Sequence, residues 1–373
     1  MARCGVTTPV TAQPRVVHVV PAEFGGGGVF GGAERYAMEL ARFMSRRVPT
    51  SLVTFGPHAR HYRLDDLEVH VLRNWVNVRR FVLDPVNPGL LRYLWNAGVI
   101  HYHQTFTLMS SYALMYARAA RTPIFTTNLG GGGMGLHQLT SIDDRFAGHL
   151  HISEFSRRAH GHANLSTAHV IYGGVDVDRF SPDASVVRTN EVLYVGRLLP
   201  HKGINYLVDA VDADTPLLLA GRRWRHAARF SALLEEHAQG KSVAFREDLD
   251  DAAVVDAYRR ALCVVLPSVF ESVFGEKHAL PELLGQTLLE GMACGTPAIT
   301  TAVASLPEVV EDGVTGFVVP PNDAAALRDR IHWLREHPAE AAAMGRAARA
   351  RVLKHFTWDT VVQRCLDYYG RAA

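Results

Sequence analysis

Hydrophobic positions along this chain occur in short continuous runs, separated by stretches with helical periodicity. In the first half, the runs predict strands at residues 15–20, 51–55, 67–72, 98–103, 123–128 and 149–153. The clearest helix among them is predicted at residues 32–45. Continuous apolar strands that alternate with helices are typical of a parallel sheet covered on both faces. The first half therefore predicts a doubly wound α/β domain.

The same pattern starts again in the second half. It predicts strands at residues 192–196, 217–221, 242–245, 263–267, 298–301 and 316–319. The intervening run HVIYGGVDVDRFSPD has paired glycines and a proline, as is typical of a linker. We expect a first domain at 1–174, a second at 175–355, and a C-terminal helix within 356–373 that packs across the domain junction. Two such Rossmann-like domains would face a central cleft at the carboxyl ends of their strands.

Length and composition agree with two domains and exclude some partners. The chain has 373 residues, 48% of them hydrophobic, which is enough for two cores. With 39 Lys plus Arg against 37 Asp plus Glu, no strong field would attract nucleic acid. The apolar run at 16–20 is too short for a signal peptide or a membrane span. A peripheral contact with the inner face of the membrane, through a basic helix face, stays open, as does the oligomeric state.

Cysteine and histidine usage predicts a cytoplasmic protein without a metal. The four cysteines lie far apart in the sequence, which favours reduced thiols. His101 and His103 are a close histidine pair, and neither cysteine nor carboxylate flanks them. Three D-x-D triplets fall in a turn and at helix edges and are not interpreted as a metal site: Asp176 with Asp178, Asp212 with Asp214, and Asp248 with Asp250.

The segment PELLGQTLLEGMACGTP, residues 281–297, predicts a helix whose N-terminus can face a ligand. The helix should begin near Gln286 and end before Gly295, and Pro297 prevents its continuation. The first amides of a helix have no internal partners and attract anions, and Gly285 lets a phosphate approach them closely.

Two carboxylates flank this helix start. Glu282 and Glu290 are separated by seven residues. Carboxylates repel phosphate but accept hydrogen bonds from vicinal sugar hydroxyls, so this arrangement favours a sugar nucleotide. The alternative is an ordinary amphipathic helix with an exposed glutamate.

Two cations follow the first strand of the second domain, in VGRLLPHKG. Arg197 can bind a diphosphate with two parallel hydrogen bonds, and Lys202, which should open the next helix, can act as a point charge. The alternative is that both are ordinary surface cations.

Two features of the first domain also lie at the carboxyl ends of predicted strands. The run GGGGVFGG, residues 25–32, follows the first strand, but no acidic residue ends the second strand as a dinucleotide fingerprint requires. We interpret this run as a mobile loop near phosphate or acceptor, or else as a flexible connector. His103 ends the fourth strand, where it could donate to a sugar hydroxyl or to developing charge, or could be structural.

Taken in order, these motifs resemble the retaining glycosyltransferases of family 4 (glycosyl transferases group 1), which have the GT-B fold. The resemblance extends over nearly the whole chain. It rests on GGAERYAMELAR (31–42), HYH (101–103), YGGVDVDRFSP (172–182), VGRLLPHKG (195–203), PELLGQTLLEGMACGTP (281–297) and LPEVVEDGVTGFVVPPND (306–323).

The resemblance implies roles for the second-domain residues. Glu290 would hold the nucleotide ribose, Glu282 would face the hydroxyls of the donor sugar, and Arg197 and Lys202 would neutralise the leaving phosphates. Backbone amides for the diphosphate and sugar are implied at Gly285, Gln286, Thr287 and Leu288.

In the first domain, the resemblance implies that His103 lies near the reacting centre of the sugar. Gly31 and Gly32 would lie close to the phosphates and the acceptor.

The implied activity is metal-independent hexosyl transfer with retention (EC 2.4). The donor would be a nucleotide-diphosphate sugar, with UDP favoured, and no further cofactor is implied. The acceptor would be a hydroxyl of an unidentified glycan, glycolipid or small-molecule glycoside. Family members act by same-face attack, in which the leaving phosphate helps to take the acceptor proton. A GT-B sugar-nucleotide epimerase and a non-catalytic sugar- or nucleotide-binding protein stay open as alternatives.

One segment departs from the family pattern. Pro267 and Ser268 are separated from Glu282 by an insertion that contains Glu271, followed by Phe274 and Gly275, which imitates the family's Glu-x-Phe-Gly form. Spacing favours Glu282. We expect the inserted segment to form a loop at the cleft that shapes the donor-sugar or acceptor site.

Overall fold

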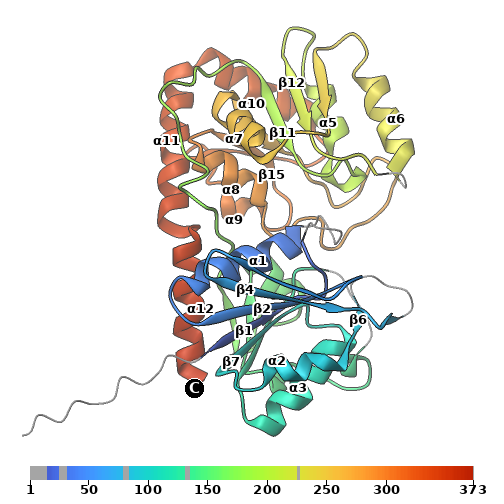
Figure 1. Cartoon of the computed structure of the whole chain (residues 1–373). Helices are drawn as coiled ribbons and strands as arrows, with labels where there is room; N and C mark the ends of the chain where they lie inside the picture. The colour runs from blue at the N-terminus through green and yellow to red at the C-terminus, as the bar shows by residue number, and fades with distance from the viewer. Residues whose placement is uncertain (1–14, 25–31, 79–83, 131–134, 225–226, 373) are drawn as a thin grey trace, which may run out of the picture. The chain divides into compact units, whose positions relative to one another are not determined.

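The computed structural model describes residues 15–24, 32–78, 84–130, 135–224 and 227–372 (Figure 1). The chain divides into two compact units, one of residues 1–150 with 365–373 and one of residues 151–364. Residues 151–174, which the linker pattern assigned to the first domain, make contacts inside the second unit. The backbone amides of Glu154 and Phe155 donate to Glu308, and the Ile171 carbonyl accepts from Arg364.

The first unit contains most of an eight-stranded sheet of order β10-β9-β8-β7-β1-β2-β4-β3. Its edge strand β10 lies within the residues that are grouped with the second unit. The strands of this sheet are β1 (Val16–Val19), β2 (Thr50–Gly56), β3 (Arg60–Leu64), β4 (Leu67–Arg73), β7 (Val99–His103), β8 (Ile124–Thr127), β9 (Gly148–His151) and β10 (Ala168–Val170). All six strands expected from the apolar runs are present, and they pair in parallel. The pattern missed β3, which pairs antiparallel to β4 at the edge, because its sequence RHYRL is mostly exposed and polar.

Helices cover both faces of this sheet. On one face, Val17, Val19, Ile100 and Tyr102 pack in a buried apolar cluster with side chains of α2 (Leu91–Leu94) and α3 (Leu108–Ala120). The helix α1 (Gly32–Ser45), whose bounds match the prediction, lies on the opposite face (Figure 1). A short hairpin of β5 (Val76–Asn77) and β6 (Pro85–Val86) completes the strands described in this unit.

The second unit contains a six-stranded sheet of order β13-β12-β11-β14-β15-β16, in which every described pair is parallel. All six strands confirm the sequence prediction to within about one residue: β11 (Val192–Val195), β12 (Leu217–Ala220), β13 (Val243–Arg246), β14 (Cys263–Leu266), β15 (Ala298–Thr301) and β16 (Gly316–Val319). The described helices of this unit are α4 (Glu154–Ala159), α5 (Ile204–Ala210), α6 (Ala228–His237), α7 (Asp251–Arg260), α8 (Gln286–Ala293), α9 (Leu306–Val309), α10 (Ala324–Glu336) and α11 (Pro338–His355). The last helix, α12 (Trp358–Ala372), is divided between the two units after Arg364.

Each sheet has one point at which the strand order reverses. In the first sheet this switch point lies between β1 and β7, and in the second it lies between β11 and β14. In open parallel sheets, ligands bind beside the carboxyl ends of the strands at such a point. The residues after β1, β7, β11 and β14 are therefore the first place to look for a site.

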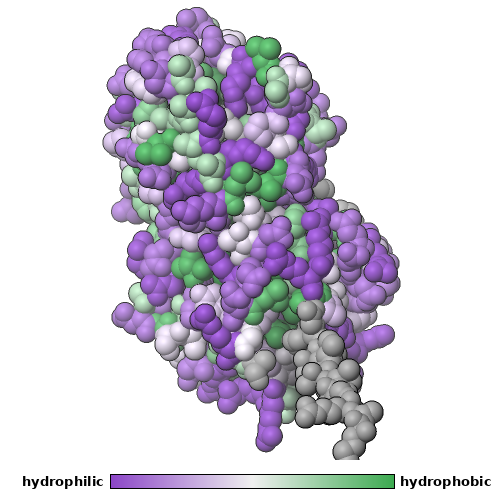
Figure 2. Space-filling model, turned by 90° about the vertical axis from the view of Figure 1, so that its left-hand side faces the viewer, coloured by the Kyte–Doolittle hydropathy of each residue, from purple (hydrophilic) through white to green (hydrophobic). Residues whose placement is uncertain are grey.

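The face seen in Figure 2 is mostly hydrophilic, with hydrophobic residues in small separate groups. Among the described helices, none is both long and apolar enough to cross a bilayer. Cys263 and Cys294 are buried free thiols, Cys365 is also buried, and Cys4 lies outside the described residues. Burial raises the pKa of the Cys294 thiol to about 12, which keeps it protonated and unreactive at neutral pH.

Candidate functional site

Lys202 and Glu282 meet at the switch point of the second sheet. Lys202 ends a 3-10 turn, Pro200–Lys202, that follows β11, and Glu282 lies in the loop that follows β14. The Lys202 Nζ atom lies 2.5 Å from Glu282 Oε2, and the two side chains are only 12% and 14% exposed. Ser268 Oγ donates to the same carboxylate oxygen over 3.4 Å. The structure thus brings together two predicted site residues that are 80 positions apart in sequence.

The turn that holds Lys202 depends on a glycine. Contrary to the prediction that Lys202 opens a helix, α5 begins only at Ile204, after Gly203. Gly203 has a φ of 64°, and a Cβ there would lie 2.0 Å from the Pro267 carbonyl oxygen. Only glycine allows this close approach of the loop after β11 to the end of β14. This packing places Lys202 beside the segment that leads to Glu282.

Glu282 and Glu271, the two candidates for the first carboxylate of the motif, differ in burial and in their contacts. Glu271 is exposed and forms an isolated antiparallel bridge with Lys277 in the inserted segment. Glu282 is mostly buried, and its backbone carbonyl accepts from Ser305 Oγ over 3.2 Å. A positioned, desolvated carboxylate is the form that can discriminate among sugar hydroxyls.

The helix α8 starts as the motif predicts. Gly285 is the N-cap residue, with a left-handed φ of 88°, and α8 runs from Gln286 to Ala293 before the left-handed Gly295. The Leu288 amide donates to the Gly285 carbonyl over 3.0 Å, so it can bind a ligand only if that bond breaks. Gln286 Nε2 donates to the Gly174 carbonyl over 2.9 Å, and Thr287 is partly exposed at the helix start.

Glu290 lies in the second turn of α8 and is 3% exposed. Its Oε2 atom accepts a hydrogen bond from the Tyr258 hydroxyl over 3.1 Å. This hydrogen bond orients the buried carboxylate within the second unit.

Arg197 follows β11 and is exposed. Its carbonyl accepts from the buried Tyr194 hydroxyl over 2.9 Å, which fixes the backbone of this loop. Within the described part of the chain, its guanidinium has no ion-pair partner. Arg197 is therefore a cation held at the carboxyl end of β11 by its backbone.

His103 belongs to a buried histidine cluster at the switch point of the first sheet. His18 on β1 pairs in register with His101 on β7, and His103 is the last residue of β7. His18 Nδ1 lies 2.9 Å from His103 Nε2, and His101 contacts the Tyr369 hydroxyl at 2.6 Å. The ligand atoms of the three histidines lie within 4.8 Å of one another, so they are also a candidate metal-binding group.

His18 was not predicted as part of this cluster. The only signal in the sequence is that His18 is a polar residue within the apolar run of β1. Its neighbours on β7 lie more than 80 positions further along the chain, so local spacing does not reveal the cluster. Burial lowers the pKa of His18 to about 3 and holds the pKa values of His101 and His103 well below 6.5. All three rings are therefore neutral at physiological pH.

Of the glycine-rich run, only Gly32 can be placed. Gly32 is the first residue of α1 and is exposed. Gly31 and the rest of the run at 25–30 lie outside the described residues.

The inserted segment forms a compact turn. The His278 amide donates to the Phe270 carbonyl over 2.8 Å, and the Ser272 amide donates to the Glu276 carbonyl over 2.9 Å. The Phe274 ring packs under the Arg229 guanidinium, 4.1 Å away. The His278 ring lies 4.8 Å from that of His201, the neighbour of Lys202. The segment is thus connected to the Lys202 turn, and its predicted effect on the donor-sugar or acceptor site stays a prediction.

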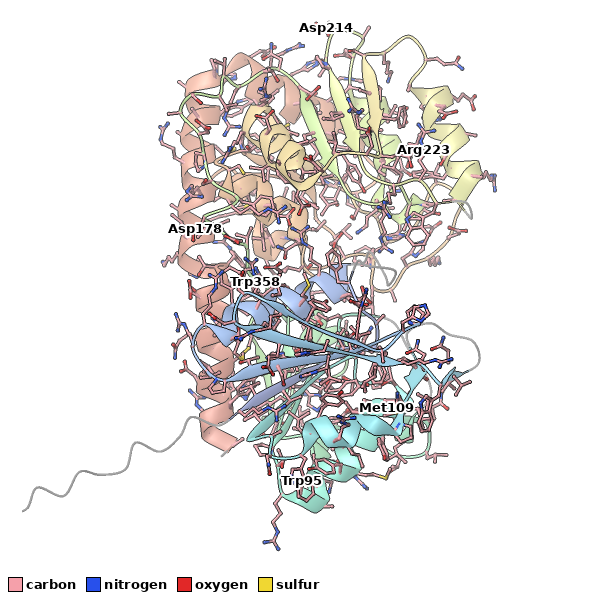
Figure 3. All side chains as sticks on the ribbon, in the orientation of Figure 1. Trp95, Met109, Asp178, Asp214, Arg223 and Trp358 are labelled. Carbon is pink, nitrogen blue, oxygen red and sulfur yellow. The ribbon has the colours of Figure 1, made fainter. Side chains whose placement is uncertain are left out.

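The D-x-D aspartates serve local structure in the described residues. The labelled Asp178 and Asp214 lie in exposed turns (Figure 3). Asp176 accepts from the amide of Asp178, Asp212 pairs with His332, and Asp250 is the N-cap of α7.

An apolar pocket of about 420 Å³ lies in the first unit between α3 and residues 135–139. Met109, on α3 in Figure 3, forms part of its wall. Its other walls include Leu108, Tyr112, Met115 and Leu136. Pockets of this volume suit ligands of drug size or parts of larger ligands.

Comparison with known proteins agrees with this fold and motif set. Residues 179–351 match the family model described as Glycosyl transferases group 1. Glycogen synthase from Mycobacterium tuberculosis is 30% identical over 213 residues, which are 55% of this chain and about half (49%) of that protein. A D-inositol 3-phosphate glycosyltransferase from Xylanimonas cellulosilytica is 26% identical over an alignment of 429 positions that covers 98% of both proteins.

A solved structure shows the same architecture. The crystal structure of Anabaena Alr3699/HepE, in complex with UDP and glucose, superposes with a TM-score of 0.72 at 17% sequence identity, over 96% of this chain and 100% of that chain. The two parallel-sheet domains with their switch-point residues therefore define a protein of the GT-B fold. Within that fold class, residues 179–351 are similar to the glycosyl transferases group 1 family, whose model they match.

Proposed function

We propose that this chain transfers a hexose from a nucleotide-diphosphate sugar to a hydroxyl acceptor, with retention and without a metal. The observation that supports it most is the Lys202–Glu282 pair, held at the second switch point just before the N-terminus of α8. A cation for phosphate, free helix amides and a carboxylate for sugar hydroxyls occur there within one loop system.

In this proposal, the second unit binds the donor. Glu290 binds the ribose hydroxyls and Glu282 binds hydroxyls of the sugar. Lys202, Arg197 and the first amides of α8 stabilise the negative charge that grows on the diphosphate as the glycosidic bond breaks.

The proton of the acceptor needs a destination in this proposal. Glu282 is already paired with Lys202, and Glu290 is buried against Tyr258. Neither carboxylate is a free base, so we assign the proton to the leaving phosphate, on the same face of the sugar as the attack.

UDP-sugars are the first donors to test. The related Anabaena structure was solved in complex with UDP and with UDP-glucose. Its 17% identity supports a common fold, and we extend the nucleotide to this chain as part of the proposal. A cytoplasmic location, with or without a peripheral membrane contact, stays a prediction.

The acceptor side lies in the first unit in this proposal. The apolar pocket lies beside α3, the helix that follows β7 in the chain, and β7 ends at His103. Its apolar walls would leave buried hydroxyls without partners, so a bare sugar should not enter it. We propose that it holds the apolar part of a glycolipid or aryl glycoside acceptor.

To test this proposal, turnover by the purified protein is measured with a panel of UDP-, GDP- and ADP-sugars as donors. The acceptors are glucose, octyl glucoside and phenyl glucoside. We expect turnover of at least one donor, faster with the octyl or phenyl acceptor than with glucose. Glu290→Gln should lower this turnover by about tenfold or more, because a neutral amide replaces the charge-assisted acceptor. Glu340→Gln, which makes the same substitution at an exposed position in the first turn of α11, is the matched control and should retain full activity.

Three outcomes would contradict the proposal. Absence of binding and turnover with every sugar nucleotide would refute sugar transfer. Conversion of a sugar nucleotide without any acceptor would indicate an epimerase, and tight binding of free sugar without nucleotide would indicate a binding protein.

A further inference from the structure

The outer face of α3, in the first unit, is apolar. A helix on the surface of a domain usually has an apolar face against the core and a polar face towards water. The inner side of α3 packs in the buried core cluster through Ala113 and Ala117. On its outer side, Leu108 and Met115 are exposed, and their spacing of seven residues places them on one face. The helix is therefore apolar towards water as well as towards the core.

Leu108 and Met115 belong to the rim of the apolar pocket of the first unit. This pocket is also lined by Leu139, which is 84% exposed, and by Val86 of β6, a strand that lies beside α3 (Figure 1). Val76 on β5 is the cross-strand partner of Val86, so the two side chains share a face of the hairpin, and Val76 is exposed. We refer to Val76, Leu108, Met115 and Leu139 as the apolar rim.

The charges around the apolar rim have one sign. Residues 85–142, which contain three of the four rim residues, have no aspartate or glutamate, although the whole chain has 37. Arginine is the charged residue of this segment, at positions 92, 118 and 121. Arg118 is exposed and lies three positions after Met115, which is about one turn of α3. Asp84, just before the segment, is fully buried and accepts from the Leu108 amide over 2.9 Å.

This combination fits a lipid surface better than a second copy of the chain. Exposed apolar side chains gain free energy at the boundary between lipid headgroups and acyl chains, and arginines beside them are attracted by anionic lipids. Two copies of this face would instead bring arginines together, and residues 85–142 supply no carboxylate to compensate them.

We propose that the apolar rim and Arg118 are a docking surface for a bilayer that contains anionic lipids. The sequence left open a contact through a basic helix face, whereas this surface is apolar with a cation at its edge. For the acceptor, the inference rests on the proposed function. The pocket then opens towards the bilayer, which favours a glycolipid over an aryl glycoside.

Flotation with lipid vesicles tests this surface without any sugar nucleotide. The vesicles contain phosphatidylcholine alone, or phosphatidylcholine with about a quarter of phosphatidylglycerol. We expect the wild type to float with the anionic vesicles and to bind the neutral vesicles several-fold more weakly. A wild type that does not bind the anionic vesicles would overturn the proposal.

A matched pair of variants tests the apolar rim. Leu139→Asp should bind the anionic vesicles about tenfold or more weakly, because it removes apolar area and adds a charge that the lipids repel. Val187→Asp is the control, since Val187 is 81% exposed and lies in the second unit, and it should bind as the wild type does. Val76→Asp should repeat the loss at a residue of the hairpin. Equal vesicle binding by all three variants, shown to be folded by circular dichroism, would contradict the proposal.

A second pair tests the cation. Arg118→Ala should bind the anionic vesicles about fivefold more weakly and leave binding to the neutral vesicles unchanged. Arg346→Ala removes the same charge from an exposed position on α11 and should change neither. Losses of the same size in both variants would show that the net charge of the chain, and not this surface, determines the binding.

Sedimentation velocity decides between the bilayer and a second copy. The wild type and Leu139→Asp should sediment alike. A wild-type dimer that Leu139→Asp converts to a monomer would assign the apolar rim to a second copy and overturn the proposal. Turnover of sugar nucleotides with phenyl glucoside is measured separately. Its absence would refute the proposed function, whereas vesicle flotation still decides the docking surface.

Discussion

At the scale of single residues, the Lys202–Glu282 ion pair should stabilise the fold as well as take part in the proposed donor binding. Both side chains are largely removed from water, so loss of one partner leaves the other charge buried without compensation. We expect Lys202→Met and Glu282→Gln each to lower the free energy of unfolding by about 1–3 kcal/mol. The double variant should cost less than the sum by about 1–2 kcal/mol. Urea unfolding of the four proteins measures this coupling.

An exposed ion pair serves as the control for that cycle. Arg260 and Asp256 are 56% and 44% exposed, with a 2.6 Å contact. The coupling between Arg260→Met and Asp256→Asn should stay below about 0.5 kcal/mol. Strictly additive costs at Lys202 and Glu282 would show that the mostly buried pair is no more strongly coupled than this one.

Motif spacing was sufficient to select most residues of the candidate site, but it gave none of their contacts. Glu282 was preferred over Glu271 by its distance from Glu290, and its burial beside Lys202 supports that choice. The ion pair itself joins residues 80 positions apart, and no local pattern encodes such a contact. His18 was missed for the same reason, since its partner on β7 is distant in sequence.

At the scale of elements, the start of α8 depends on Gly285. Its φ is 88°, and a Cβ there would lie 2.8 Å from Leu306 Cδ2. Gly285→Ala should therefore combine backbone strain with a clash. Gly313→Ala has only the strain, because at a φ of 72° its Cβ would meet nothing within 4 Å.

The comparison of these two glycines predicts a difference in stability. We expect Gly313→Ala to cost about 1 kcal/mol and Gly285→Ala about 1–2 kcal/mol more, measured by urea unfolding. Gly285→Ala should also weaken UDP binding in calorimetry, because the helix start must shift. Equal costs, with unchanged UDP affinity, would remove Gly285 from the proposed phosphate site.

The turn at residues 270–278 is held mainly through Phe274. Its ring packs with Arg229 and lies edge-on to Phe230 on α6. Phe274→Ala should release the turn from α6, speed hydrogen exchange at 271–277, and raise KM for the sugar nucleotide several-fold. Val273→Ala, at a side chain that is 38% exposed, is the control and should change neither. Faster exchange with an unchanged KM and acceptor preference would separate this turn from the site.

The strands were predictable from the sequence to the extent that they are buried. Most of the continuous apolar runs, such as that of β15, became parallel strands with a fully buried pattern, whereas the edge strand β13 has no fully buried residue. The sequence pattern did not predict β3, because an edge strand with one partner needs few apolar residues. The 3-10 turn before α5 was not predicted either. Gly203 in this turn has a positive φ and packs closely against Pro267, which is distant in the sequence.

At the scale of the whole molecule, both candidate sites lie at switch points. The sequence predicted alternating strands and helices, but the order in which strands pair is a non-local property. Only that order shows that His103 lies next to β1, and that the loops after β11 and β14 are neighbours. Local patterns therefore predicted the candidate residues, whereas topology determines which of them can act together.

The buried histidines give the whole molecule a predictable sensitivity to acid. Their folded-state pKa values are lowered, to about 3 for His18 and for His201, against about 6.5 when unfolded. For His201 the cause is burial first, then the charges of Lys202, His278 and Arg197. Between these values the unfolded chain binds protons that the folded chain does not, so stability is complete above about pH 6.5 and falls as the pH drops towards 3.

The lowered pKa values predict how the free energy of unfolding depends on pH. At pH 5, each fully buried histidine that stays neutral in the folded state, such as His18, should lower the free energy of unfolding by about 2 kcal/mol relative to neutral pH. His201→Gln should flatten the profile measured by urea unfolding between pH 7.5 and 5. The control is His58→Gln, at an exposed position, which should leave the profile unchanged. A wild-type stability that stays constant over this range would mean that the buried histidines bind protons without unfolding.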